Sequence, residues 1–362
     1  MRRLIALAAL AVALAAPAAA LAQERPRGDT RVFALIPRPG FPAMAYVAPN
    51  GRVYEGTYTN PGGDNVPSRV FEYEADGTLM RSWTIRGQNL SEAHGVQVGT
   101  FDARGRLILL DKNPPRVLRL DRVTGEQETI ARFPAGAIPN YAAWGPDNAL
   151  YVTDYEGATI WRVPPGGGDP KPWLQDANLD GGPFGTTGIV LEAGRTSFLI
   201  SQMSAAGGGA GNPTTGRLLR VPLAAGGAPG PISVLWESTP FDAPDGFAVA
   251  KSGVIYVALL AANQIAVIGP DGAERERFGG AGSPVPFDAP SSARFLGTRL
   301  MVANQAYITG EPAHHAILDV ETREAGLPEY IPPEPAAKKK KKKVSKKNKQ
   351  RKRKRGKRRR SS

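Results

Sequence analysis

Short apolar runs alternate with turn residues along most of the chain. Typical runs are Arg106–Leu110, Leu150–Thr153 and Val254–Ala258, and Gly, Pro, Asn and Asp separate them. Apolar runs of this length between turn residues are typical of β-strands. The chain also contains 42 glycines and 33 prolines, which are the poorest helix formers. The pattern therefore predicts an all-β body and excludes a helical bundle.

Turn residues recur before an apolar run at six places. They are Gly51, Gly105, Asn148, Gly194, Gly253 and Gly297, spaced 54, 43, 46, 59 and 44 residues apart. Glycine adopts a left-handed backbone without steric cost, and asparagine is its most tolerable replacement. A further short strand precedes each turn, and these strands begin at Pro42–Met44, Ala93–Gly95, Pro139–Tyr141, Thr187–Ile189, Pro244–Gly246 and Pro290–Ser292.

Repeats of about 50 residues with four short strands are typical of β-propeller blades. We therefore predict a six-bladed β-propeller over residues 31–331. The sixth repeat lacks a clear fourth strand before Pro332, and the run Arg31–Ile36 can supply it. Such a strand would close the ring and remove its open sheet edges.

Both ends of the chain differ from the repeats. Residues 1–22 contain Arg2 and Arg3, an apolar run and the small-residue site Ala20–Ala22, which together predict a cleaved secretory signal peptide. An uncleaved membrane anchor is the alternative. We expect a secreted or cell-envelope-associated protein with no transmembrane segment after cleavage. Residues 332–337 are predicted to be a Pro-rich linker, and residues 338–362 a disordered Lys/Arg-rich tail.

The net charge of +13 arises from the tail. Residues 338–362 hold 18 of the 46 Lys and Arg residues and no acid, so the rest has 28 basic and 33 acidic residues. The basicity therefore does not indicate a nucleic-acid-binding fold. We expect the tail to dock to an anionic polymer, such as a cell-envelope polyanion or extracellular nucleic acid. A solvated tail without a specific partner is the alternative.

The composition also limits the possible chemistry. Cysteine is absent, and the only histidines are His94, His314 and His315. Disulfides, thiolate metal sites and a cysteine nucleophile are excluded, and a zinc site with several histidines is disfavoured. Oxygen ligands remain, and they favour calcium or magnesium over softer metals.

The fifth repeat resembles a known family. Ala243–Val249 followed by Ser252–Val257, together with Tyr151–Asp154, is similar to the senescence marker protein, gluconolactonase and luciferin-regenerating enzyme family. The resemblance extends over the repeats in blade order, although the motifs are shared with other six-bladed propellers, including the NHL-repeat type. It implies a propeller with one divalent cation, often calcium, in its central channel. Several members of the family hydrolyse sugar lactones.

The resemblance also implies site residues. In that family a glutamate at the start of the first blade, an asparagine at the fourth and an aspartate at the fifth hold the cation. Asp245 matches the aspartate, Thr187 replaces the asparagine, and Gly40–Ala43 contains no carboxylate. Asn140 matches a substrate-contacting asparagine at the third blade.

We therefore expect Asp245 to be the metal ligand and base, and Asn140 to bind metal or substrate. Thr187 and His94 are candidate substrate contacts. All four residues begin innermost strands, so they should face the same mouth of the channel. Each of the main candidates also has a structural interpretation, because aspartate and asparagine commonly stabilise turns. His94 would then be a hydrogen-bonded turn histidine.

Two function classes remain open. Lactone or ester hydrolysis needs a Lewis acid to polarise the carbonyl and a base to direct water, which one cation and one carboxylate can provide. The alternative is a non-enzymatic secreted propeller, similar to the NHL type, that binds a ligand or partner. The fold alone does not decide between them, because propellers have many unrelated functions.

Overall fold

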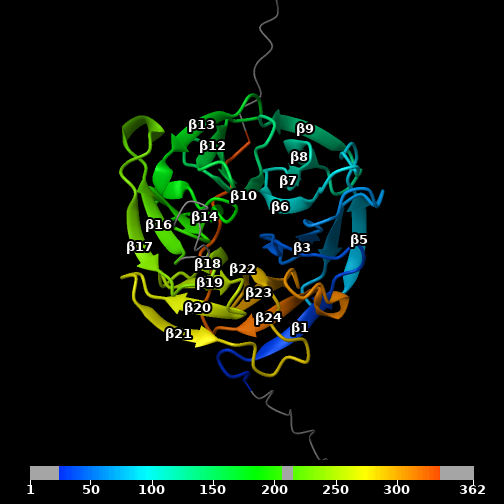
Figure 1. The fold of residues 1–362 in the computed structure, drawn as a ribbon, viewed down its shortest axis with the longest axis vertical. Coiled ribbons are helices and arrows are strands. Elements are labelled where there is room, and N and C mark those ends of the chain that lie inside the picture. The colour runs from blue at the N-terminus through cyan, green and yellow to red at the C-terminus, as the bar shows by residue number, and fades with distance from the viewer. Residues whose placement is uncertain (1–23, 206–214, 335–362) are drawn as a thin grey trace, which may run out of the picture.

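Six four-stranded antiparallel sheets surround a central channel (Figure 1). The structure is a computed structural model that describes residues 24–205 and 215–334. The predicted signal peptide, residues 335–337 of the linker and the tail lie outside the described residues. The described part contains no α-helix, only three short 3-10 helices at Ala177–Leu179, Ala225–Gly227 and Pro312–His314. The predicted all-β six-bladed propeller is confirmed.

Blades one to three follow chain order, with the innermost strand first. Blade one contains β2 (Tyr46–Val47), β3 (Val53–Gly56), β4 (Arg69–Tyr73) and β5 (Leu79–Thr84). Blade two contains β6 (Val96–Phe101), β7 (Leu107–Lys112), β8 (Pro115–Leu120) and β9 (Gln127–Arg132). Blade three contains β10 (Pro139–Trp144), β11 (Leu150–Asp154), β12 (Thr159–Val163) and β13 (Lys171–Gln175).

Blades four and five repeat this order, and blade six combines both ends of the folded chain. Blade four contains β14 (Thr186–Leu191), β15 (Ser197–Gln202), β16 (Arg217–Pro222) and β17 (Ser233–Glu237). Blade five contains β18 (Pro244–Val249), β19 (Ile255–Leu259), β20 (Gln264–Ile268) and β21 (Glu274–Phe278). Blade six contains β22 (Pro290–Leu296), β23 (Arg299–Asn304), β24 (Ala316–Glu321) and β1 (Thr30–Leu35).

The first strand closes the ring. β1 pairs antiparallel with β24 in a register that places Thr30 opposite Val320 and Leu35 opposite Ala316. The predicted closing strand at Arg31–Ile36 is confirmed, and it begins and ends one residue earlier than predicted. Ala34 points into the apolar cluster between blades six and one, whereas the side chain of Leu35 is exposed. The N-terminal strand therefore joins the last blade to the first.

Five of the six predicted turn residues have the expected backbone. Gly51, Gly105, Gly253 and Gly297 have positive φ angles, as does Asn148 with φ of 63°. The prediction for Gly194 is wrong, because the left-handed residue of that turn is Arg195. In blade four the closing bond joins the Glu192 amide to the Ser197 carbonyl, one residue further apart than in blades one, two, three and five. The left-handed Arg195 lies three residues after Glu192, as Gly51 lies three residues after Ala48, and the extra residue of the turn follows it.

Blade packing buries the innermost strands on both faces. Every residue of β6 and of β10 is buried. The largest apolar cluster spans blades one to four and contains the fully buried rings of Tyr46, Tyr54 and Tyr151. Burial of this kind positions the starts of the innermost strands rigidly around the channel.

We expect Ala34→Asp to destabilise the whole ring. The substitution places an unpaired charge in the cluster between blades six and one, which costs more than about 3 kcal/mol and lowers the melting temperature by roughly 10 °C. The matched control, Leu35→Asp, places the same charge on the exposed side of β1 and should change little. Thermal unfolding measured by circular dichroism checks both. Equal melting temperatures for the two variants would contradict the role of β1 in closing the ring.

Candidate functional site

The innermost strands begin at one mouth of the channel, here called the front mouth, and end at the opposite rear mouth. Four of these strands are irregular where they begin. Their pairing register shifts between Pro139 and Ala142, Thr186 and Ile189, Pro244 and Phe247, and Pro290 and Ser292. Such bulges re-aim side chains at the end of a strand. The predicted residues Asn140, Thr187 and Asp245 all lie within these irregular starts.

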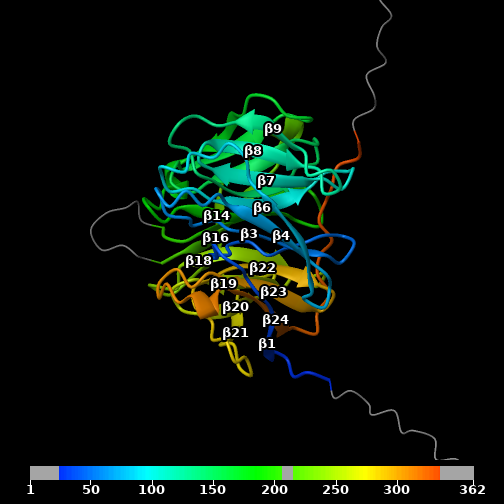
Figure 2. The ribbon, with the colours of Figure 1, turned by 90° about the vertical axis from the view of Figure 1, so that its right-hand side faces the viewer.

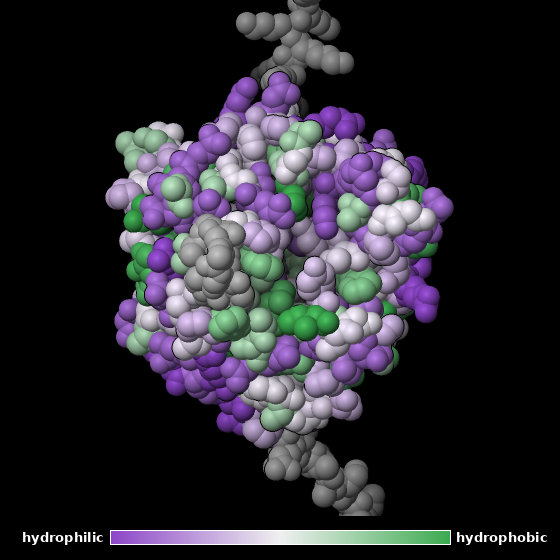
Figure 3. Space-filling view, in the orientation of Figure 1, coloured by the Kyte–Doolittle hydropathy of each residue, from purple (hydrophilic) through white to green (hydrophobic). Residues whose placement is uncertain are grey.

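The front mouth contains a pocket of about 340 Å³, and the corresponding face is hollowed near its centre in Figure 3. Its volume lies in the range of small-molecule sites. Apolar residues on one side are Pro183, Phe184, Met203 and Leu260. The polar lining includes Tyr58, Gln97, Lys112, Asn140, Tyr155, Asp245, Ser291 and Gln305. Two of the four predicted site residues, Asn140 and Asp245, are therefore brought together here.

Asp245 is the most deeply buried acid of this pocket. Its side chain is held at the start of β18, and the residue is 8% exposed. Burial raises the pKa of Asp245 well above its usual range, and hydrogen bonds from the Gly246 amide and the Thr187 hydroxyl offset only part of this rise. Glycine is required at position 246, because a Cβ there would lie 2.2 Å from the Tyr141 hydroxyl oxygen. Burial thus shifts the protonation equilibrium of Asp245 toward the neutral carboxyl.

Two amide oxygens of the pocket, Asn140 Oδ1 and Gln97 Oε1, are buried and have no hydrogen-bond partner within the described residues. The Asn140 amide nitrogen donates to the Tyr58 hydroxyl at 3.3 Å, which orients the amide. Buried polar atoms in folded proteins are nearly always paired. These two oxygens are therefore available to hydrogen-bond donors of a bound molecule.

Lys112 is a functional candidate that sequence analysis missed. It ends β7, and its amine lies 5.1 Å from the centre of the Tyr58 ring. Burial lowers the pKa of Lys112, and the nearby Glu156 carboxylate opposes this only in part. The sequence signal was a lysine directly after the buried run Leu107–Asp111, a position that also fits an ordinary hairpin residue.

The other two predicted site residues lie outside the pocket lining. The Thr187 hydroxyl lies 2.9 Å from that of Ser201, so it stands behind Asp245 as a supporting residue. His94 is buried, and its two ring nitrogens lie 2.9 Å and 2.8 Å from the carbonyl oxygens of Glu92 and Val66. Both nitrogens of His94 are thus engaged by the backbone. This geometry favours the structural interpretation of a hydrogen-bonded turn histidine.

A buried carboxylate supports the start of the first blade. Glu55, on β3, accepts hydrogen bonds from the backbone amides of Ala43, Met44 and Gly56 at 3.0–3.1 Å. Sequence analysis found no carboxylate at this blade because it considered only the innermost strand. Glu55 does not line the front pocket. Burial raises its pKa to about 8, and its second oxygen has no partner among the described residues.

Comparison with solved structures places this architecture among known propellers. Regucalcin, a calcium-binding protein from Agrobacterium tumefaciens, has a TM-score of 0.61 at 17% identity, covering 83% of this chain and 98% of its own. A gluconolactonase from Xanthomonas campestris has a TM-score of 0.53 at 17% identity, covering 82% and 98%. These structural neighbours are gluconolactonase-like six-bladed propellers.

The similarity concerns the fold. A PQQ-bound aldose sugar dehydrogenase from Streptomyces coelicolor also matches, with a TM-score of 0.58 at 17% identity over 82% of this chain and 99% of its own. No model of a protein family matches the chain, and no curated protein does. Because gluconolactonase-like propellers and a dehydrogenase share the architecture, the function must be argued from the site.

The donors of the front pocket differ from the cation site that the resemblance implies. The described residues contain no group of three or more His, Asp or Glu side chains placed to hold one ion. Asp245 supplies one carboxylate, Ala43 at the first blade has no donor, and the Thr187 hydroxyl is already shared with Ser201. The only other carboxylate of the pocket is the exposed Glu156. Asp245 with neutral amide oxygens is a poor match for a dehydrated divalent cation. The calcium site at Asp245 and Asn140 stays a prediction.

We expect Glu55 to make stability depend on pH. Its pKa is about 8 in the folded protein against 4.5 for the free side chain, so the folded state binds this proton more tightly. Its contribution is fully present below pH 4.5 and is lost as pH rises to about 8, by up to about 1.4 kcal/mol per pH unit. Glu55→Gln keeps an oxygen for the three amides and removes the titration.

Urea unfolding of both proteins at pH 5, 6, 7 and 8 measures this contribution. The free energy of unfolding of the natural chain should fall more steeply with pH than that of Glu55→Gln. Other buried carboxyls are the same in both proteins and cancel in the difference. Parallel curves for the two proteins would contradict the raised pKa of Glu55.

Proposed function

We propose that the front pocket binds a small, oxygen-rich molecule and hydrolyses its lactone or ester bond. The observation that carries the proposal is the convergence of Asp245 with the unpartnered oxygens of Asn140 and Gln97 in one pocket. Amide oxygens accept hydrogen bonds from hydroxyl groups, and a polyol ring such as a sugar lactone presents several of them. The gluconolactonase-like fold agrees with this substrate class.

The pocket contains groups suited to each part of hydrolysis. The neutral Asp245 carboxyl donates a hydrogen bond to the carbonyl oxygen and stabilises the charge that forms there. Lys112, whose pKa is lowered by burial, accepts a proton from the attacking water. The tetrahedral intermediate then expels the ring oxygen, which takes that proton from Lys112. In this proposal Asp245 is a hydrogen-bond donor instead of the base expected from the sequence.

Calcium, if bound, would be held by Asp245 and Asn140 and would polarise the carbonyl in place of the carboxyl proton. Because the only other carboxylate of the pocket is the exposed Glu156, we expect a dissociation constant no lower than about 1 mM. Calorimetric titration of calcium into the purified protein, with Asp245→Ala as the comparison, measures it. Micromolar binding that disappears in Asp245→Ala would establish a calcium site and overturn the hydrogen-bond-donor role of Asp245.

Substitution of the two reacting groups tests the proposed hydrolysis. We expect Asp245→Ala and Lys112→Met each to lower kcat/KM for a hydrolysed lactone by about 10²-fold or more. Asp169→Asn and Lys171→Met change exposed residues of the same types at the outer rim and should leave turnover unchanged. A panel of aldonolactones and aryl esters, followed by proton release, provides the measurement.

Two results would overturn this assignment. Turnover that persists in Asp245→Ala and Lys112→Met would place the chemistry elsewhere. Absence of turnover across the panel, together with saturable binding of a sugar acid that Asp245→Ala abolishes, would make the protein a binding propeller. This second class is the alternative that the sequence left open.

The tail is proposed to dock the protein to an anionic polymer outside the cytoplasm. Glu334, the last described residue, pairs with Arg104 at 3.1 Å, in the turn between β6 and β7 at the rear mouth. Figure 2 shows the orange-red C-terminal segment along one side of the propeller, so the chain leaves on the side opposite the front pocket. Docking through residues 338–362 leaves the front pocket accessible.

We expect the tail to dominate retention on heparin. The full chain should elute at much higher salt than a chain that ends at Pro335, because counterion release makes binding by Lys and Arg steeply salt-dependent. Catalytic or ligand-binding activity of the front pocket should be the same in both. Equal elution of the two chains would contradict docking through the tail.

A further inference from the structure

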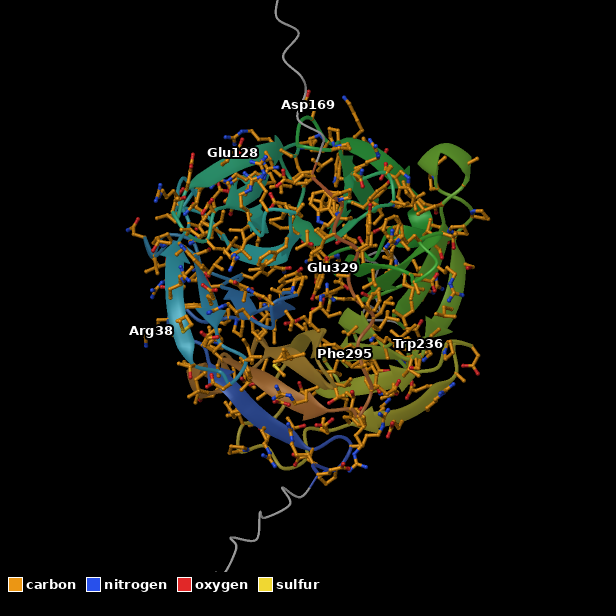
Figure 4. All side chains as sticks on the ribbon, turned by 180° about the vertical axis from the view of Figure 1, so that it is seen from behind. Arg38, Glu128, Asp169, Trp236, Phe295 and Glu329 are labelled. Carbon is orange, nitrogen blue, oxygen red and sulfur yellow. The ribbon has the colours of Figure 1, made fainter. Side chains whose placement is uncertain are left out.

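The last described segment crosses the rear mouth. Residues 325–331, here called the C-terminal strap, run over the channel end opposite the front pocket, and Figure 4 shows Glu329 at the centre of the ring from this side. The Leu327 amide donates to the Val249 carbonyl at 2.8 Å. The Tyr330 hydroxyl donates to Asn148 at 2.7 Å, and its ring lies 4.2 Å below the Arg195 guanidinium. The strap thus contacts blades three, four and five.

A second pocket lies between the strap and the ends of the innermost strands. Its volume is about 420 Å³. Most of its lining is apolar, from Ala142, Trp144, Ile189, Leu191, Val249 and Phe295. Its cationic residues are Arg294 and Lys251. Walls of this kind favour an apolar body and disfavour a polyol.

Part of the Arg294 guanidinium is free to donate hydrogen bonds. It projects from β22, and its Nη1 donates to the carbonyls of Phe247 at 2.7 Å and Ala293 at 3.3 Å. Its Nε and Nη2 make no hydrogen bond with any described residue. A guanidinium edge with free N–H groups matches the two oxygens of a carboxylate.

The carboxyl group of Glu329 also lines this pocket. Burial raises the pKa of Glu329, and the attraction of Arg294 offsets only part of this rise. Glu329 accepts hydrogen bonds from the Tyr46 hydroxyl at 2.5 Å and the Thr100 hydroxyl at 2.7 Å. Among the described residues, the longest ion pair has an N–O distance of 3.9 Å. Glu329 and Arg294 do not form an ion pair at this distance or below. The oxygens of Glu329 accept hydrogen bonds from hydroxyl groups, which leaves the Nε–Nη2 edge of Arg294 without a hydrogen-bond partner among the described residues.

The two pockets have no lining residue in common. Tyr141 lines the front pocket, and its hydroxyl donates across the channel to the Ser291 carbonyl at 2.7 Å. The Arg294 guanidinium of the rear pocket lies over the Tyr141 ring, 6.0 Å from its centre. A molecule in the rear pocket would therefore not occupy the front pocket.

We infer that the rear pocket binds a small amphipathic carboxylate. Its carboxylate would pair with the free edge of Arg294, and its apolar body would lie against Trp144, Leu191 and Phe295 beneath the strap. This gives the propeller a second ligand of a different class from the polar substrate of the front pocket.

Octanoate is a suitable probe, and octanamide is its uncharged match. Calorimetry on the full chain should give octanoate a dissociation constant below about 1 mM, at least tenfold lower than that of octanamide. Arg294→Gln should weaken octanoate binding at least tenfold. Arg38→Gln removes an exposed arginine at the outer rim (Figure 4) and should not change it. Asp245→Ala should also leave it unchanged, which separates this site from the front pocket.

A fluorescence measurement keeps the inference testable if Arg294→Gln fails to fold. Trp144 lines the rear pocket, so 8-bromooctanoate should quench its emission with the same concentration dependence as binding. Trp144→Phe should remove most of that quenching. The inference is overturned if octanoate does not bind, if octanamide binds equally well, or if quenching is the same in Trp144→Phe.

Discussion

The pairing of β1 with β24 is the contact on which the rest of the molecule depends. It joins residues 30 and 320 in one sheet and so converts six stacked sheets into a closed ring. The pairing covers the outer edge of β24, and ring closure fixes the six innermost strands around one channel. Without ring closure, nothing would hold the side chains of blades three and five at one mouth of the channel. The front pocket is therefore a product of ring closure more than of any local segment.

The periodic part of this architecture could be predicted from sequence, because each blade repeats a short strand and a turn that obey local rules. The positions of Asp245 and Asn140 at one mouth follow from the same period. Lys112 and Glu55 escaped prediction because they lie on second strands, and burial decides their role. The bond between Thr100 and Glu329 joins residues far apart in the chain, so no local pattern could reveal the strap.

The two mouths of the channel differ in the polarity of their side chains. The front mouth buries an acid, a lysine and unpartnered amide oxygens, whereas the rear mouth places Arg294, Lys251 and Glu329 among mostly apolar side chains. Tyr141 lines the front pocket and packs against Gly246, where a larger residue would collide with it, and Arg294 of the rear pocket lies over its ring. The two pockets share no lining residue, so each can hold its own ligand.

Binding of a polar ligand in the front pocket is the central claim about this protein. A crystal structure of the protein soaked with gluconate, the acid released from its lactone, tests this claim. We expect gluconate to bind in the front pocket. The hydroxyl groups of gluconate should donate to Asn140 and Gln97, and its carboxylate should lie beside Asp245. Gluconate bound only at another surface, or a front pocket that stays filled by water at saturating gluconate, would contradict it.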